Sequence, residues 1–131
     1  MITLKTLPDA SAQDVFNQVA FHLLSQGERA MDGDCVYHAP DGLRCAAGCL
    51  ISDEEYKEDM EWNGWLDLVD AGLVPNEHAD LILELQNLHD MEHPDDWAGS
   101  LSSLAGKLGL AVDRALNTAM QSYNEEHGDD D

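Results

Sequence analysis

The spacing of apolar residues predicts a mostly helical chain. Between Ser11 and Gly27, apolar side chains recur every three or four positions, as they do along one face of an α-helix. The Ser11 side chain can cap the helix N-terminus, and Gly27 readily takes the left-handed conformation that ends many helices. We therefore expect a helix over this segment. Its apolar stripe consists of Val15, Phe16, Val19, Ala20, Leu23 and Leu24.

Residues 34–45 have a different pattern, which predicts the one β-element of the chain. Cys35 to Tyr37 favour an extended strand, and Ala39-Pro40-Asp41-Gly42 has the residues of a tight turn. The next seven residues, "CAAGCLI", suit a short helix packed through small side chains. Ser52 and Glu55 then form a capping-box pattern at the start of a further helical turn.

The remaining chain again carries helical patterns. Apolar residues at helical spacing occupy 64–72, 76–92, 94–108 and 112–123. We therefore predict a mainly α (α+β) fold, a helical domain with one small β-hairpin. Residues 1–124 are expected to form a single globular domain, and residues 125–131 an acidic frayed tail.

The net charge of the chain narrows the classes of binding partner that it can have. Twenty-seven acids against six bases give a net charge of −21. Residues 1–52 hold six acids and three bases, whereas residues 53–131 hold 21 acids and three bases. Such a field repels nucleic acid and anionic lipid and attracts basic surfaces. We therefore expect no direct nucleic-acid binding and no membrane binding.

The chain has the features of a cytoplasmic protein. No apolar run reaches the ~18 residues of a membrane span, and the start lacks the apolar centre of a signal peptide. Three cysteines are an odd number, which excludes a complete intrachain disulfide framework and favours a reducing compartment.

The acids are the strongest candidate for a working surface. Carboxylates one helical turn apart stand ~5.4 Å from each other along the axis, and DNA spaces its phosphates ~3.4 Å per strand. Acidic helices can therefore present rows of charge to a protein groove built for DNA. The alternative is an acidic surface that serves solubility alone. The predicted partner-binding residues are Asp53, Glu54, Glu55, Glu58, Asp59, Glu61, Asp67, Asp70, Glu77, Asp80 and Glu84.

Four soft ligands raise the question of zinc. Cys35, His38, Cys45 and Cys49 follow one another in the order C-x2-H-x6-C-x3-C, which matches none of the strong zinc signatures. The alternative is that the cysteines are small buried apolar side chains. We predict no metal ligand and no cofactor, and a small zinc-stabilised domain is kept as a third hypothesis.

Two other patterns bear on catalysis and metal binding. His89 and His93 are one helical turn apart, but the glutamate of an H-E-x-x-H zinc site is missing after the first histidine. A catalytic cysteine needs an electropositive surrounding, and this chain offers the opposite. No nucleophile elbow or phosphate-binding glycine loop is present. We therefore predict that the protein is not an enzyme and has no catalytic residue.

One run of motifs resembles a known family. His-Leu-Leu-x-Gln-Gly at 22–27 is followed by Cys-x-Tyr at 35–37, Asp-Gly-Leu-x-Cys-Ala-x-Gly-Cys-Leu-Ile at 41–51 and Asp-x-x-Tyr at 53–56. With "LILELQNLHD" further on, this series is similar to small acidic proteins of phage genomes and prophages, mostly hypothetical proteins, over about residues 13–110. The resemblance implies a phage origin and therefore a location in the cytoplasm of a bacterial host cell. It also implies that the position of His38 need not be a metal ligand.

Phage origin and strong acidity together predict an inhibitor. It would bind a basic, nucleic-acid-handling host protein, partly by DNA mimicry, as an anti-defence or host-takeover factor. The alternative is a protein-binding or assembly module of another kind, in which an apolar patch meets the partner. In the inhibitor, Trp62, Trp65 and Trp97 are anchors if they are exposed, although core packing is the expected place of all three.

Overall fold

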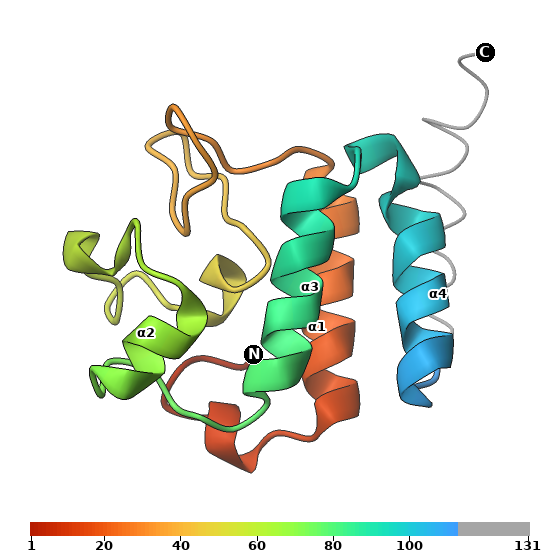
Figure 1. Ribbon diagram of the computed structural model, residues 1–131, viewed down its shortest axis with the longest axis horizontal. Coiled ribbons are helices and arrows are strands. Elements are labelled where there is room, and N and C mark those ends of the chain that lie inside the picture. Colours follow the sequence, from red (N-terminus) through yellow and green to blue (C-terminus); the bar gives the residue numbers. More distant parts are fainter. Residues whose placement is uncertain (113–131) are drawn as a thin grey trace.

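The computed structural model describes residues 1–112, which form four α-helices joined by turns and short 3-10 helices (Figure 1). The helices are α1 (Ala12–Gln26), α2 (Trp65–Asp70), α3 (Ala79–Met91) and α4 (Trp97–Leu108). The 3-10 helices are η1 (Leu7–Asp9), η2 (Gly48–Leu50), η3 (Glu58–Met60) and η4 (Pro94–Asp96). The expected mainly α fold is therefore confirmed for this part of the chain.

Helix α1 follows the sequence pattern closely. The Ser11 side chain accepts a hydrogen bond of 3.1 Å from the backbone N–H of Asp14, and Gly27 ends the helix at φ +70°. All six residues of the predicted stripe are buried. α1 packs against both α3 and α4, and α3 also contacts α2. In Figure 1, α3 crosses in front of α1, with α2 on one side and α4 on the other.

The later helices begin a few residues after their predicted starts. Residue His78, at φ +63°, precedes α3, and its Nε2 lies 2.6 Å from the carbonyl oxygen of Ala10. Pro94 opens η4 rather than an α-helix, and α4 begins at Trp97. The predicted helix over 112–123 lies, except for Val112, outside the described residues, as does the predicted domain boundary after residue 124.

The predicted hairpin at 34–45 does not form strands. Within residues 1–112, pairing is limited to two isolated bridges, one of which joins His38 to Arg44. The tight turn is present, with a 2.8 Å hydrogen bond from the backbone N–H of Ala39 to Leu43 O. The strand fails to extend because the N–H groups of Tyr37 and His38 donate to the Glu61 side chain instead of a neighbouring strand.

The helix predicted for "CAAGCLI" shortens to the single turn η2, and its glycine explains how the segment packs. A Cβ atom on Gly48 would lie 2.0 Å from the carbonyl oxygen of Tyr37. The chain at 35–38 therefore lies directly on η2, where no side chain fits between the two backbones. Ser52 and Glu55 form their reciprocal capping box, but only a turn follows it.

The described residues enclose one apolar core. It includes Trp65 and Trp97, which are 2% and 0% exposed, whereas Trp62 is 72% exposed. The expectation of core packing is thus confirmed for two of the three tryptophans. No helix among residues 1–112 has the length and apolar character needed to cross a membrane.

Candidate functional site

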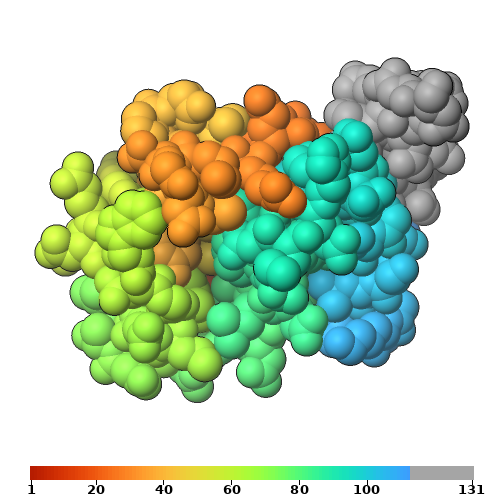
Figure 2. All heavy atoms as spheres, turned by 45° about the horizontal axis from the view of Figure 1, so that its top comes forward, coloured from red at the N-terminus to blue at the C-terminus, as the bar shows by residue number. Residues whose placement is uncertain are grey.

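Residues 53–70, which we call the acidic lobe, contain eight carboxylates and one lysine. The acidic lobe comprises η3, α2 and the turns around them, and it lies on the side of α3 away from α4 (Figure 1). In the space-filling view it forms one end of the molecule (Figure 2). Most of its carboxylates are exposed. These are Asp53, Glu54, Glu58, Asp59, Asp67 and Asp70.

Glu55 belongs to the acidic lobe but holds the fold together. Its Oε1 accepts hydrogen bonds of 3.0 Å from the backbone N–H groups of Ser52 and Leu4, and its Oε2 accepts one of 3.0 Å from Lys5. Burial alone would raise the pKa of Glu55, but these backbone donors stabilise the carboxylate and lower its pKa overall. The carboxylate thus fixes the N-terminal segment and is not free to meet a partner.

Glu61 has a comparable structural role. Its Oε1 accepts from the backbone N–H of Tyr37 at 2.9 Å, and its Oε2 accepts from the backbone N–H of His38 at 3.1 Å. The Tyr56 hydroxyl donates to the same Oε2 at 2.7 Å. Like Glu55, Glu61 therefore satisfies backbone N–H groups of a distant part of the chain.

Asp53 is exposed but paired. Its carboxylate forms an ion pair with Arg44, whose guanidinium also lies 2.7 Å from Nδ1 of His38. The His38 ring stacks on Tyr56 with centroids 4.2 Å apart, and its Nε2 lies 2.9 Å from the carbonyl oxygen of Gly48. Burial, together with the Arg44 charge, lowers the pKa of His38. This cluster therefore keeps a neutral histidine between a cation and an aromatic ring.

The predicted rows of charge on helices are short. Asp67 and Asp70 are one turn apart on α2, and the Asp67 side chain also accepts from the backbone N–H of Gly64. On α3, Asp80 and Glu84 are one turn apart, and Glu84 pairs with Lys107 of α4 at 3.6 Å. Glu77 is exposed in the turn before α3, at a distance along the chain from the acidic lobe. The acids at 53–61 lie on turns and η3, so their spacing is not that of an α-helix.

The four soft ligands singled out from the sequence do not converge. Among residues 1–112, the group of three possible ligands that lie within 4.8 Å of one another consists of Cys35, His89 and Asp90. His38 is instead hydrogen-bonded to carbonyl oxygens, and Cys45 is 1% exposed. Burial raises the pKa of Cys49 to about 12 and that of Cys45 further. Both thiols therefore behave as the small apolar side chains of the alternative interpretation.

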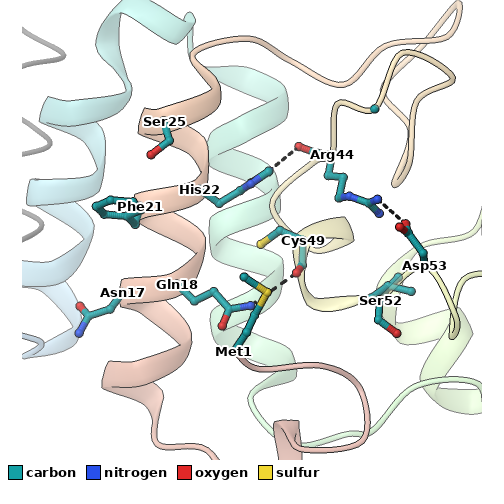
Figure 3. Close-up of a pocket in the computed structure, with 12 residues that line it drawn as sticks. Met1, Asn17, Gln18, Phe21, His22, Ser25, Arg44, Cys49, Ser52 and Asp53 are labelled. Atoms are coloured by element: carbon teal, nitrogen blue, oxygen red, sulfur yellow. Dashed lines mark hydrogen bonds and ion pairs between the residues drawn. The ribbon is translucent and has the colours of Figure 1, made fainter.

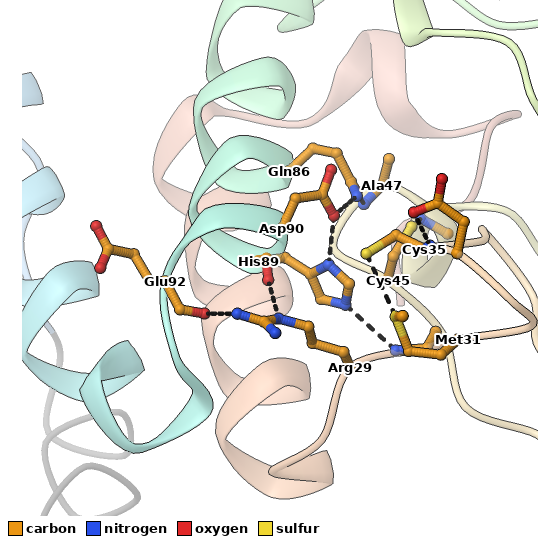
Figure 4. Close-up of polar contacts among 12 residues, drawn as sticks. Arg29, Met31, Cys35, Cys45, Ala47, Gln86, His89, Asp90 and Glu92 are labelled. Atoms are coloured by element: carbon orange, nitrogen blue, oxygen red, sulfur yellow. Dashed lines mark hydrogen bonds and ion pairs between the residues drawn. The ribbon is translucent and has the colours of Figure 1, made fainter.

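The side chains of His89, Asp90 and Gln86 form a hydrogen-bonded network (Figure 4). His89 is fully buried, with Nδ1 2.7 Å from Asp90 Oδ1 and Nε2 3.4 Å from the backbone N of Ala30. Because the Ala30 N–H can only donate, Nε2 accepts and Nδ1 carries the proton that is donated to Asp90. Gln86 also donates to Asp90 at 2.8 Å. A metal ion at Nδ1 would displace this proton and turn two N–H groups toward each other.

Cys35 lies beside His89 and Asp90 of this network, but it is a poor nucleophile. Burial raises the pKa of its thiol to about 11, and the Asp90 carboxylate adds to the effect. The Sγ atom is 3.5 Å from Sδ of Met31. Sequence reasoning missed His89 and Asp90 as neighbours of Cys35, because only the fold brings residues so far apart in the chain together.

A pocket of about 820 Å³ lies between α1 and the turns at 42–53 (Figure 3). In Figure 3, Gln18 and His22 of α1 lie on one wall, and Arg44 and Asp53 lie on the opposite one. The His22 ring nitrogen Nε2 is 2.9 Å from the carbonyl oxygen of Arg44, which closes one part of the wall. Phe21, Ile51 and Met1 contribute apolar surface to the same pocket. The apolar stripe of α1 gave no signal for this pocket, because Gln18, Phe21 and His22 lie off the buried side of that helix.

Comparison with known proteins adds no assignment. No family model matches the chain, and neither a curated protein nor a solved structure matches it.

Proposed function

We propose that this protein is a phage-type inhibitor that binds a basic, nucleic-acid-handling host protein, partly by DNA mimicry. The observation that carries the proposal is the acidic lobe, with eight carboxylates and one lysine at one end of the molecule. Ordinary surfaces interleave both signs of charge, whereas this one presents eight carboxylates against one lysine over a continuous stretch of chain. A basic groove would be attracted to it over about 8–10 Å, the screening distance at physiological salt.

The structure changes which acids the proposal uses. Glu55 and Glu61 are occupied by the fold, so we assign the contact to exposed carboxylates of the acidic lobe. Glu54, Glu58 and Asp59 form no hydrogen bond or ion pair through their side chains with the rest of residues 1–112. They lie on a turn and on the single turn η3, so the mimicry is of charge density and not of regular phosphate spacing.

The test compares two triple variants with equal net charge. In the first, Glu54, Glu58 and Asp59 are replaced by lysine; in the second, Asp9, Glu28 and Asp32, which are exposed and lie outside the acidic lobe, are replaced by lysine. Immobilised proteins are exposed to a bacterial lysate at about 50 mM and about 500 mM salt, where screening differs strongly. We expect the wild type and the second variant to retain nucleic-acid-binding proteins at low salt, and the first variant to lose them.

Direct competition then checks the mechanism. A retained protein is purified, and its complex with labelled duplex DNA is titrated with the wild type. Mimicry predicts release of the DNA, with a midpoint that rises steeply with salt. Retention of the same proteins by both triple variants, or a ternary complex with DNA, would contradict the proposal.

The pocket beside α1 favours a second candidate, an assembly module with an apolar contact. Phe21 is 49% exposed and lines this pocket together with Ile51. If this surface carried the binding, replacement of Phe21 by alanine would abolish capture and both triple variants would keep it.

A further inference from the structure

Trp62 is the most unusual side chain of the acidic lobe. It is 72% exposed, whereas Trp65, three residues later, is 2% exposed. An indole is costly to leave in water, and large exposed aromatic side chains are informative because folding normally buries them. The sequence pattern did not separate the two tryptophans, since both precede or open the same short helix.

The backbone holds Trp62 in an unfavourable conformation. Its φ is +68°, in the left-handed region that bulky residues rarely adopt. The surrounding turn is fixed: the Asn63 side chain donates to the carbonyl oxygens of Asp59 at 3.0 Å and Glu61 at 3.1 Å. The hydroxyl of Tyr37 donates to the carbonyl oxygen of Asn63 at 2.6 Å. The indole is therefore presented by a rigid turn tied to the core.

Acidic residues flank Trp62 in the sequence. Glu58 and Asp59 of η3 precede Trp62, and Asp67 and Asp70 of α2 follow it, all four exposed. Leu66, on the first turn of α2, is itself 50% exposed. An apolar centre with anionic neighbours is complementary to a basic protein surface that carries an apolar pocket. Nucleic acid would stack on the indole but would be repelled by the carboxylates.

We propose that Trp62, assisted by Leu66, is the anchor of the interface with the basic host protein, inserting into an apolar pocket beside its lysines and arginines. This inference rests on the proposed function and adds a contact that duplex DNA does not make. Tryptophan is enriched among interface residues whose removal costs most affinity. The contact of the Trp62 indole contributes binding free energy that salt does not screen. The carboxylates contribute binding free energy that salt does screen.

The test uses three purified bacterial proteins with basic nucleic-acid grooves as probes: a type II topoisomerase, an RNA polymerase and a restriction endonuclease. Dissociation constants are measured at about 50 mM and about 500 mM salt. The variant is Trp62→Asn, because asparagine tolerates a positive φ and the turn should stay folded. The matched control is Met91→Ala, which removes another apolar side chain that is 73% exposed and lies outside the acidic lobe. Thermal melting of both variants shows whether the fold is kept.

We expect Trp62→Asn to weaken binding by about tenfold to a hundredfold at both salt concentrations, and Met91→Ala to change it by less than about twofold. Lysine at Glu54, Glu58 and Asp59 should weaken binding mainly at low salt. If that triple variant loses binding and Trp62→Asn does not, the anchor is overturned and the proposed function stands. If neither variant changes the affinity, or no probe binds the wild type, both are overturned.

Discussion

The carboxylate of Glu55 accepts a 3.0 Å hydrogen bond from the backbone N–H of Leu4, a residue that lies 51 positions earlier in the chain. A second oxygen of the same side chain accepts from Lys5. One acid of a very acidic protein therefore fastens the N-terminal segment to the start of the acidic lobe.

Replacing Glu55 by glutamine should destabilise the protein. The amide turns an N–H₂ group toward backbone donors that the carboxylate satisfied, which costs about 1–3 kcal/mol. Urea unfolding followed by circular dichroism measures the change. The control Glu54→Gln, at an exposed neighbour, should stay within about 0.5 kcal/mol of the wild type. Equal stability of the two variants would mean that the Glu55 hydrogen bonds contribute little.

Gly48→Ala should be among the most damaging single substitutions in the described residues. The added methyl group would lie 2.0 Å from Tyr37 O and 2.8 Å from Tyr37 C, both backbone atoms that cannot move aside without shifting the loop. We expect a loss of about 3 kcal/mol or more, typical of overpacking that strains the backbone. Thermal and urea unfolding give the value.

The control for that substitution is Gly99→Ala on α4, where nothing lies within 4 Å of the new methyl group. Alanine has the higher helix propensity, so this variant should gain about 0.5–1 kcal/mol. A Gly48→Ala protein as stable as the wild type would show that the close approach of η2 and the 35–38 chain is not required.

His38 should make stability fall as the solution is acidified below neutrality. Its pKa in the folded protein is lowered from 6.5, chiefly by burial and also by the Arg44 charge. As pH falls below about 6.5, the unfolded chain therefore binds a proton before the folded protein does, and stability is lost until the pH passes the folded pKa.

The acids respond to pH as well, so the comparison is made with His38→Phe, which keeps a ring to stack on Tyr56. The stability advantage of the wild type over this variant should shrink between about pH 7 and pH 5. A constant difference across that range would contradict the assignment.

Trp62 should report the electric field of the acidic lobe. Because Trp65 and Trp97 are buried, collisional quenchers reach the Trp62 indole first. The carboxylates attract caesium and repel iodide, so caesium should have the larger quenching constant at low salt, relative to free tryptophan. About 0.5 M sodium chloride should reduce the difference, since screening shortens the range of the field. In Trp62→Phe the quenchable emission should largely vanish; equal quenching by both ions in the wild type would place the indole outside a negative field.

The helices could be predicted from the sequence because their signals are local. Ser11 and Gly27 marked both ends of α1, and its stripe proved to be the buried face. The roles of Glu55 and Glu61 could not be predicted, because their backbone donors come from distant segments of the chain. The same long-range contact from Glu61 replaced the strand pairing that Cys35 to Tyr37 had indicated. His89 and Asp90 were likewise placed beside Cys35 by tertiary packing alone.

The contact between Gly48 and Tyr37 also limits how far this architecture can drift in evolution. Because only a hydrogen atom fits between the two backbones, any larger residue at position 48 requires the loop that contains Tyr37 to move. A distant homologue that keeps the loop should therefore retain glycine there even where its acids and tryptophans have changed. Glycine at position 48 is therefore a criterion for recognising homologues whose overall sequence similarity is low.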